Sequence, residues 1–169
     1  MQYKPKHDES SFEELVRDNF DFVEVDAGMT RGRVRSSGGN DPRDAALVMR
    51  YSGDAFRFDV VWGEYEMSLT IPVKFNLDEL PKIERYVMFE PFIEYLTNGG
   101  EQAIVPYLSE SMSIRGVEAV MDQRRAVFGE GLSPVVERLG KKLQTYLGQL
   151  RAATDDQVRG YHQWMRSKR

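Results

Sequence analysis

Four glutamates are the residues whose spacing best suits recognition of a charged partner. Glu90 and Glu94 are one helical turn apart, so their carboxylates would share one face of a helix. Such a pair could act in general acid–base chemistry or bind a cation, but no third ligand follows at a suitable spacing, and a solvated helix face is the favoured interpretation. Glu64 and Glu66 flank the turn of a predicted hairpin. We expect these four residues to form an acidic binding surface for a basic protein partner.

A run of alternating arginines is the candidate anion-binding site. Arg31, Arg33 and Arg35 would point to one side if the chain is extended there. The glycine-containing loop at 36–39 could add backbone amides, because glycine lets the backbone approach an anion closely and arginine binds it through two donors. The loop matches neither a Walker loop nor a dinucleotide-binding fingerprint. An ordinary mobile loop is therefore the favoured interpretation, and anion binding is the alternative.

The residue types that most often carry catalysis or hold metals are scarce. The chain has no cysteine, which excludes a disulfide framework, a thiol nucleophile, an iron–sulfur cluster and a thiolate zinc site. His7 and His162 are the only histidines, so a histidine triad or a multi-histidine metal site would lack partners. We predict no catalytic residue, no metal ligand and no cofactor. The sequence favours a protein that is not an enzyme.

Three β-favouring runs must position these side chains. The runs at 46–51, 56–62 and 65–71 are separated by turn residues, which predicts a three-stranded antiparallel meander. Apolar residues alternate with polar ones along the second and third runs, as in a sheet with one face in the core. The residues expected to be buried are Phe58, Val60, Trp62, Met67 and Leu69.

Helical patterns dominate the rest of the chain. A capping box at Ser11–Glu14 predicts a short helix, and the apolar run Phe20–Val25 predicts a strand after it. Further helices are expected at 83–96, 102–108, 114–128 and 133–152, with a last one beginning at Thr154. The fold class is therefore α+β, a small antiparallel sheet packed with several helices. We expect one domain over 1–169, with a flexible tail at 1–10 and a helical part at 113–169 that could form an arm.

One helix shows heptad-like spacing. Five residues follow one another at intervals of 3, 4, 3 and 4, which is typical of a helix that packs against another helix. Packing within the chain is the favoured interpretation, and a homodimer seam is the alternative. The residues are Val136, Leu139, Leu143, Tyr146 and Leu150.

Charge is distributed unevenly. Residues 1–112 carry 12 Lys and Arg against 21 Asp and Glu, a net −9, and the remainder carries 11 against 6, a net +5. With a pI near 5.3, nucleic acid is an unfavoured partner. The polar N-terminus and the lack of any long apolar run predict a cytoplasmic protein with no membrane association.

These features together favour a binding protein. In its compact, acidic and motif-free character the chain is similar to small immunity or antidote proteins and to acidic effector chaperones, which implies inhibition or escort of a protein partner. The alternative is an enzyme or a small-ligand-binding protein with its pocket between sheet and helices.

Overall fold

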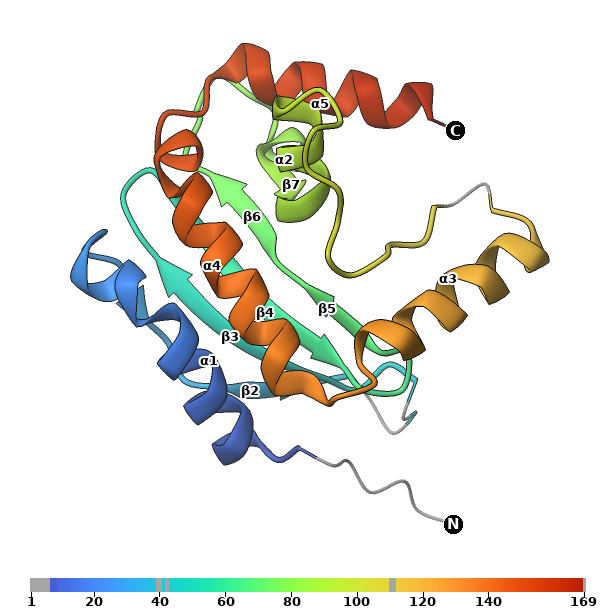
Figure 1. Ribbon diagram of the computed structural model, residues 1–169. Helices are drawn as coiled ribbons and strands as arrows, with labels where there is room; N and C mark the ends of the chain where they lie inside the picture. The colour runs from blue at the N-terminus through green and yellow to red at the C-terminus, as the bar shows by residue number, and fades with distance from the viewer. Residues whose placement is uncertain (1–6, 39–40, 42, 110–111, 169) are drawn as a thin grey trace.

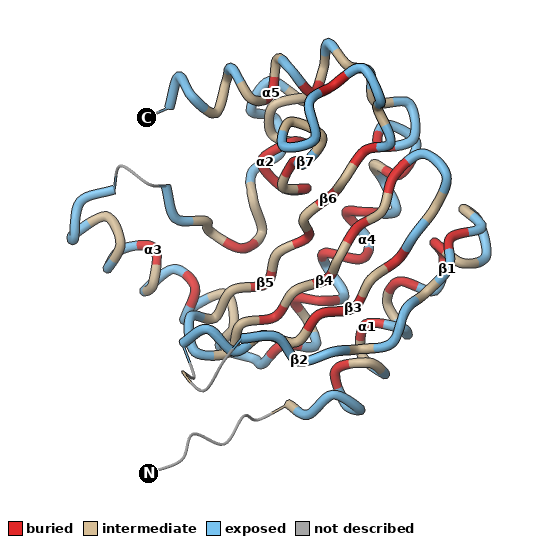
Figure 2. The backbone as a smooth tube through the Cα atoms, turned by 180° about the vertical axis from the view of Figure 1, so that it is seen from behind, coloured by how far each residue is buried: buried red, intermediate tan, exposed pale blue. Residues whose placement is uncertain are grey.

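The sheet and two long helices form two layers. The computed structural model describes residues 7–38, 41, 43–109 and 112–168; most of the predicted tail, residues 1–6, and Gly39 of the predicted anion loop lie outside them. Helices α1 (Glu9–Val25) and α4 (Leu132–Arg151) lie across one face of the sheet (Figure 1). Among the described residues, no helix covers the strands β3, β4 and β6 when the molecule is seen from behind (Figure 2).

All strand pairs in the sheet are antiparallel. Its order is β1-β3-β4-β6-β7, while β2 pairs with β3 and β5 pairs with β4. The antiparallel sheet and the helical C-terminal half confirm the predicted α+β class. The strands are β1 (Thr30–Arg31), β2 (Arg35–Ser37), β3 (Ala46–Ser52), β4 (Phe56–Gly63), β5 (Ser68–Thr70), β6 (Pro72–Phe75) and β7 (Tyr86–Met88).

The predicted meander is confirmed, with a change in its third strand. Phe58, Val60 and Trp62 are buried under the helices, as alternation predicts. Leu69 is also buried, but Met67 is only partly buried because it ends the β4–β5 turn with a positive φ of 49°. The predicted third strand therefore begins later, as β5, and a further strand that was not predicted, β6, follows after a break at Ile71.

Helix α1 corrects the predicted strand at Phe20–Val25. That run continues the helix, because Phe12, Val16, Phe20 and Val23 recur at helical spacing and are fully buried. The N-cap is Asp8 rather than Ser11: the Asp8 carboxylate accepts a hydrogen bond of 2.8 Å from the Ser11 amide.

The predicted helix at 83–96 is wrong in part, and the one at 102–108 is wrong throughout. The segment 83–96 is a 3₁₀ helix, η1 (Lys82–Arg85), followed by β7 and then α2 (Phe89–Leu96), and 102–108 is irregular chain. The expected helices after Ser113 are confirmed as α3 (Ile114–Val127), α4 and α5 (Asp155–Ser167). The Thr154 capping box of α5 is present, with Gln157 as its partner.

The heptad-like residues of α4 belong to the core of the chain itself. Val136, Leu139 and Leu143 are fully buried, Leu150 is 1% exposed, and Tyr146 is partly buried. These side chains belong to the same buried cluster as those of α1 and the sheet. A seam between two copies would require the same side chains to leave this core, so the dimer-seam alternative is not compatible with the structure.

Close contact between α1 and α4 depends on Gly140. A methyl group at this position would lie 2.5 Å from the Asn19 carbonyl oxygen of α1, so the helices would have to separate. We expect Gly140→Ala to lower the free energy of unfolding by about 1–3 kcal/mol, as for other overpacked sites. Urea denaturation measures this.

Gly148 is the matched control for that substitution. It lies in the same helix with no atom within 4 Å of an added methyl group. Gly148→Ala should therefore raise the free energy of unfolding by about 0.5–1 kcal/mol through helix propensity alone. Stabilisation by both substitutions would mean that α1 and α4 do not pack this closely.

Candidate functional site

A pocket of about 320 Å³ lies where β5, α2, α3 and the irregular chain after residue 103 meet. We call it the α2–α3 pocket. Its lining is mostly apolar, and Arg124 and Glu66 are among its polar members. Its volume is at the small end of the range for ligand pockets. The apolar lining includes Leu69, Ile71, Phe89, Pro91 and Val105.

Arg124 holds the walls of the α2–α3 pocket together. Its side chain comes from α3, and the residue is only 4% exposed. Its Nε donates to the Pro106 carbonyl at 2.8 Å and a terminal nitrogen donates to the Glu66 carbonyl at 3.1 Å. Burial lowers the pKa of the guanidinium, which nevertheless stays charged at neutral pH. Among the described residues no carboxylate lies within ion-pair distance of it.

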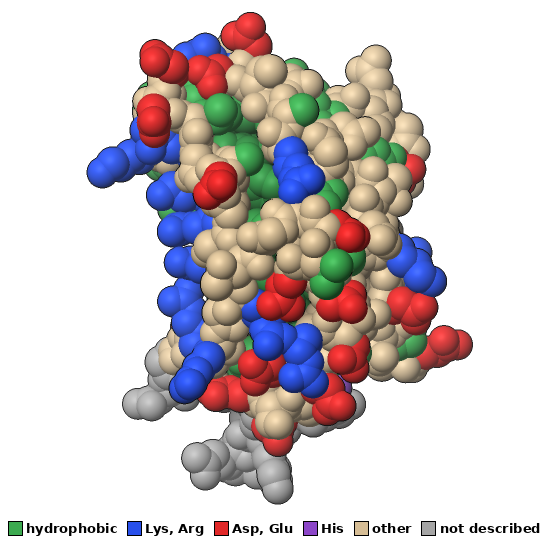
Figure 3. Space-filling model, turned by 90° about the vertical axis from the view of Figure 1, so that its left-hand side faces the viewer, with side chains coloured by type: hydrophobic (Ala, Val, Ile, Leu, Met, Phe, Trp, Pro, Cys, Tyr) green, Lys and Arg blue, Asp and Glu red, His purple; other side chains and the backbone are tan. Residues whose placement is uncertain are grey.

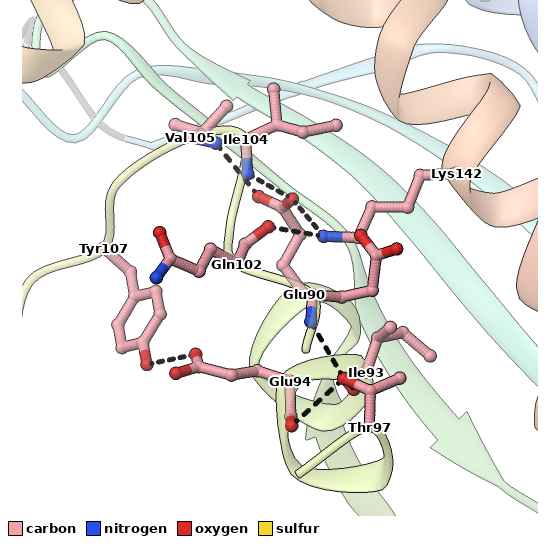
Figure 4. Close-up of polar contacts among 10 residues, drawn as sticks. Glu90, Ile93, Glu94, Thr97, Gln102, Ile104, Val105, Tyr107 and Lys142 are labelled. Carbon is pink, nitrogen blue, oxygen red and sulfur yellow. Dashed lines mark hydrogen bonds and ion pairs between the residues drawn. The ribbon is translucent and has the colours of Figure 1, made fainter. Parts of the chain in front are cut away.

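A buried ion pair fixes the chain on one side of the pocket (Figure 4). The Nζ of Lys142 on α4 lies 3.1 Å from the Oε1 of Glu90 on α2, and both side chains are less than a tenth exposed. The Glu90 carboxylate also accepts from the amides of Ile104 at 2.7 Å and Val105 at 3.1 Å. Lys142 donates in addition to the Gln102 carbonyl at 3.0 Å. The pair therefore attaches the irregular segment 102–105 to two helices.

Glu94 is also engaged inside the chain. Its carboxylate accepts a hydrogen bond of 3.1 Å from the Tyr107 hydroxyl and lies 3.5 Å from the Lys168 ammonium group. Burial, with the nearby Glu94 charge, raises the pKa of Tyr107 to about 12. Figure 4 shows Glu90 and Glu94 both directed from α2 toward the segment that carries Tyr107.

The four predicted partner-binding glutamates do not form one surface. The expectation of a solvated Glu90 is wrong. Glu90 is 7% exposed, and its carboxylate is already bonded to the Lys142 ammonium group and to two backbone amides. Glu66 is exposed in the β4–β5 turn, whereas Glu64 and Glu94 are partly buried. Glu66 and Glu90 of the four line the pocket. Recognition of a basic partner by Glu64, Glu66 and Glu94 stays a prediction.

The three arginines do not share a face, which corrects the predicted anion site. Arg31 pairs with Tyr51 of β3, and Arg35 pairs with Val48 of β3. The two arginines are four positions apart in the chain, whereas their partners on β3 are three positions apart, so one extra residue lies between β1 and β2. An extra residue of this kind reverses the side to which the following side chains point. Arg31 lies near Glu24 of α1, with 3.9 Å between their charged atoms, and Arg35 points to the opposite face of the sheet.

The remaining candidates for chemistry are structural. His162 lies 2.8 Å from the Glu84 carbonyl through its Nε2. Within the part of the chain that the structure describes, no three acidic or histidine side chains are grouped to hold a metal ion. In that same part, no helix has the length and apolar character needed to cross a bilayer.

Sequence reasoning missed Arg124 and Lys142. A signal for Lys142 exists in the sequence, since it is three residues after Leu139 and lies on the inward side of α4. Arg124 carries no comparable signal, because its partners are two backbone carbonyls in distant segments. Comparisons with protein-family models, curated proteins and solved structures give no match for this chain.

Proposed function

We propose that this chain is a protein-binding module and that the α2–α3 pocket receives an apolar side chain of its protein partner. The observation that supports this most is the continuation of the apolar lining onto the surface. Leu108 lines the pocket and is 40% exposed, and Tyr65, which precedes the lining residue Glu66 in the chain, is 54% exposed. Exposed apolar surface around a pocket is typical of a site for a macromolecule.

Two more large apolar side chains are exposed among the described residues that follow Leu108. They are Met112 and Ile114, the first residue of α3, and neither lines the pocket. A partner that extends from the pocket along α3 would meet them.

Charge supports a partner with a basic residue beside its apolar anchor. Residues 54–112 carry 11 acidic and 4 basic side chains, and they include the β4–β5 turn and α2. Glu66 is exposed at the pocket, where its charge would attract a lysine or arginine. This retains the basic-partner hypothesis for Glu66 and removes Glu90 from it, because the Glu90 carboxylate is already paired with Lys142.

A second candidate function is binding of a small apolar carboxylic acid. Arg124 favours it, because its guanidinium lines an apolar pocket and has no carboxylate within ion-pair distance among the described residues. In this case the charged end of the ligand would meet Arg124.

A pocket-filling substitution tests the proposal. Peptides selected from a displayed random library on the immobilised protein should carry an apolar residue next to lysine or arginine. Thr70 lines the pocket, so Thr70→Trp should weaken their binding by about tenfold or more, which corresponds to loss of a buried apolar anchor. Methyl NMR should show the same peptides shifting the signals of Met88 and Met165, which also line the pocket.

Thr145→Trp is the matched control, since Thr145 is exposed on α4. It should leave peptide binding unchanged. Selected peptides that bind Thr70→Trp as tightly as the unmodified chain would place the binding site elsewhere. If octanoate shifts the two methionine signals and no selected peptide does, the small-ligand function replaces protein binding.

A further inference from the structure

The face of the sheet turned away from α1 and α4 is open (Figure 2). Strand register shows which side chains lie on it, because they alternate with the buried core residues. We call this the open sheet face. Charged residues and one tyrosine occupy its centre, namely Arg50, Arg57, Asp59, Lys74 and Tyr86.

Two cations on this face are direct cross-strand neighbours. Arg57 of β4 pairs with Lys74 of β6, and Lys74 pairs with Tyr86 of β7. Like charges directly opposite each other destabilise a sheet. Tyr86 relieves this only in part: its hydroxyl lies 3.2 Å from an Arg57 terminal nitrogen, and its ring centroid lies 5.7 Å from the Lys74 Nζ.

Neither cation of the pair is neutralised by a residue that the structure describes. Asp59, the acidic residue beside them, is already held by Arg50 through two hydrogen bonds of 2.8 and 3.1 Å. In the part of the chain that the structure describes, no carboxylate lies within 4.0 Å of the charged nitrogens of Arg57 or Lys74. All five residues border a hollow of about 20 Å³, enough for one small polar group.

The positive charge extends along the open sheet face. Arg35 of β2 points to the same side, because it pairs with Val48. Figure 3 shows a column of Lys and Arg side chains down its left-hand edge, where this face is seen edge-on. The column contrasts with the net charge of −4 of the whole chain. Such a local field attracts an acidic partner although the protein as a whole is acidic.

We propose that Arg57, Lys74 and Tyr86 bind the carboxylates of an acidic polypeptide segment laid on the open sheet face. An acidic partner would remove the repulsion between the two cations, and the tyrosine hydroxyl adds a hydrogen-bonding group beside them. A nucleic acid fits less well, since one tyrosine gives no stacking platform for successive bases. This inference does not depend on the α2–α3 pocket.

Fluorescence anisotropy of a labelled oligoglutamate tests the inference. We expect binding that weakens as salt rises, and a loss of affinity of about tenfold for Arg57→Ala and for Lys74→Gln. The matched control is Arg138→Ala, which removes an exposed charge from α4 on the other side of the sheet. It should change the affinity by less than about twofold. Lys74→Gln keeps a side chain of similar length and removes the repulsion with Arg57, so its melting temperature should not fall.

Three outcomes would overturn the proposal. Equal weakening by Arg138→Ala would show that the probe responds only to overall charge. Tighter binding of oligothymidylate than of oligoglutamate, lost in Lys74→Gln, would assign the face to nucleic acid. Sedimentation that shows a dimer in the unmodified chain and a monomer in Arg57→Ala would make a second copy the occupant.

Discussion

Lys142→Met should lower the free energy of unfolding by about 3–5 kcal/mol, the typical loss when one partner of a buried ion pair is removed. The substitution leaves the Glu90 carboxylate 7% exposed with no cation beside it, and it also removes the donor to the Gln102 carbonyl. Methionine retains most of the lysine's volume, so the loss reports charge rather than a cavity. Urea denaturation at neutral pH, followed by circular dichroism, measures it.

Lys141 is the control next to it in the chain. It pairs with Glu137 at 3.0 Å, but both side chains are more than half exposed. Lys141→Met should change the free energy of unfolding by less than about 1 kcal/mol, as for other surface ion pairs. A double variant, Glu90→Gln with Lys142→Met, should recover part of the loss because no uncompensated charge stays buried. Similar small losses for Lys141→Met and Lys142→Met would show that Glu90 and Lys142 are hydrated.

Phe58→Ala should lower the free energy of unfolding by about 3–5 kcal/mol, as for other buried aromatic residues. Phe58 is 1% exposed and lies at the centre of a group of rings from three elements. Its ring centroid is 5.0 Å from that of Tyr51 on β3 and 6.1 Å from that of Phe20 on α1. Removing it would leave a cavity between the sheet and α1. Chemical denaturation with two probes, fluorescence and circular dichroism, measures the change.

Phe58→Leu is the control that separates the effect of a smaller core side chain from a general failure to fold. It keeps an apolar side chain at the same position and should lose less than Phe58→Ala, because the residual cavity is smaller. A loss below about 1 kcal/mol for Phe58→Ala would contradict the assignment of Phe58 to the core.

Much of the sheet could be predicted because strand signals are local. Alternation in 56–62 and the turn residues on either side of it specify a hairpin without reference to the rest of the chain. The same local rule failed at Phe20–Val25, where Phe20, Phe22 and Val23 are buried as the continuation of a helix face that begins at Phe12. In that segment packing on the sheet overrides intrinsic preference.

The irregular segment 102–108 could not be predicted for a different reason. Its backbone amides at Ile104 and Val105 are satisfied by the Glu90 carboxylate from α2, 14 and 15 residues earlier. The acceptor lies outside the segment, so the sequence around 102–108 does not show how these amides are satisfied.

The candidate sites depend on still longer separations. Glu90 and Lys142 are 52 residues apart, and the contact of Arg124 with the Glu66 carbonyl spans 58. The open-face location of Arg57 follows from alternation in β4, but its opposition to Lys74 requires the register of β4 with β6. The extra residue between β1 and β2 could not be predicted from the alternating arginines either, because a prediction from spacing treats the segment as one regular strand.

The weak attachment of α3 has a dynamic consequence for the α2–α3 pocket. Of the 14 residues of α3 only Val120 and Arg124 are buried, whereas nine residues of the longer α4 are. Elements with few buried contacts open at a lower free energy than the whole fold, so α3 can detach while the sheet stays intact. We therefore expect the pocket to exchange between closed and open forms, and a partner that needs the open form would bind with an apparent affinity reduced in proportion to the population of that form.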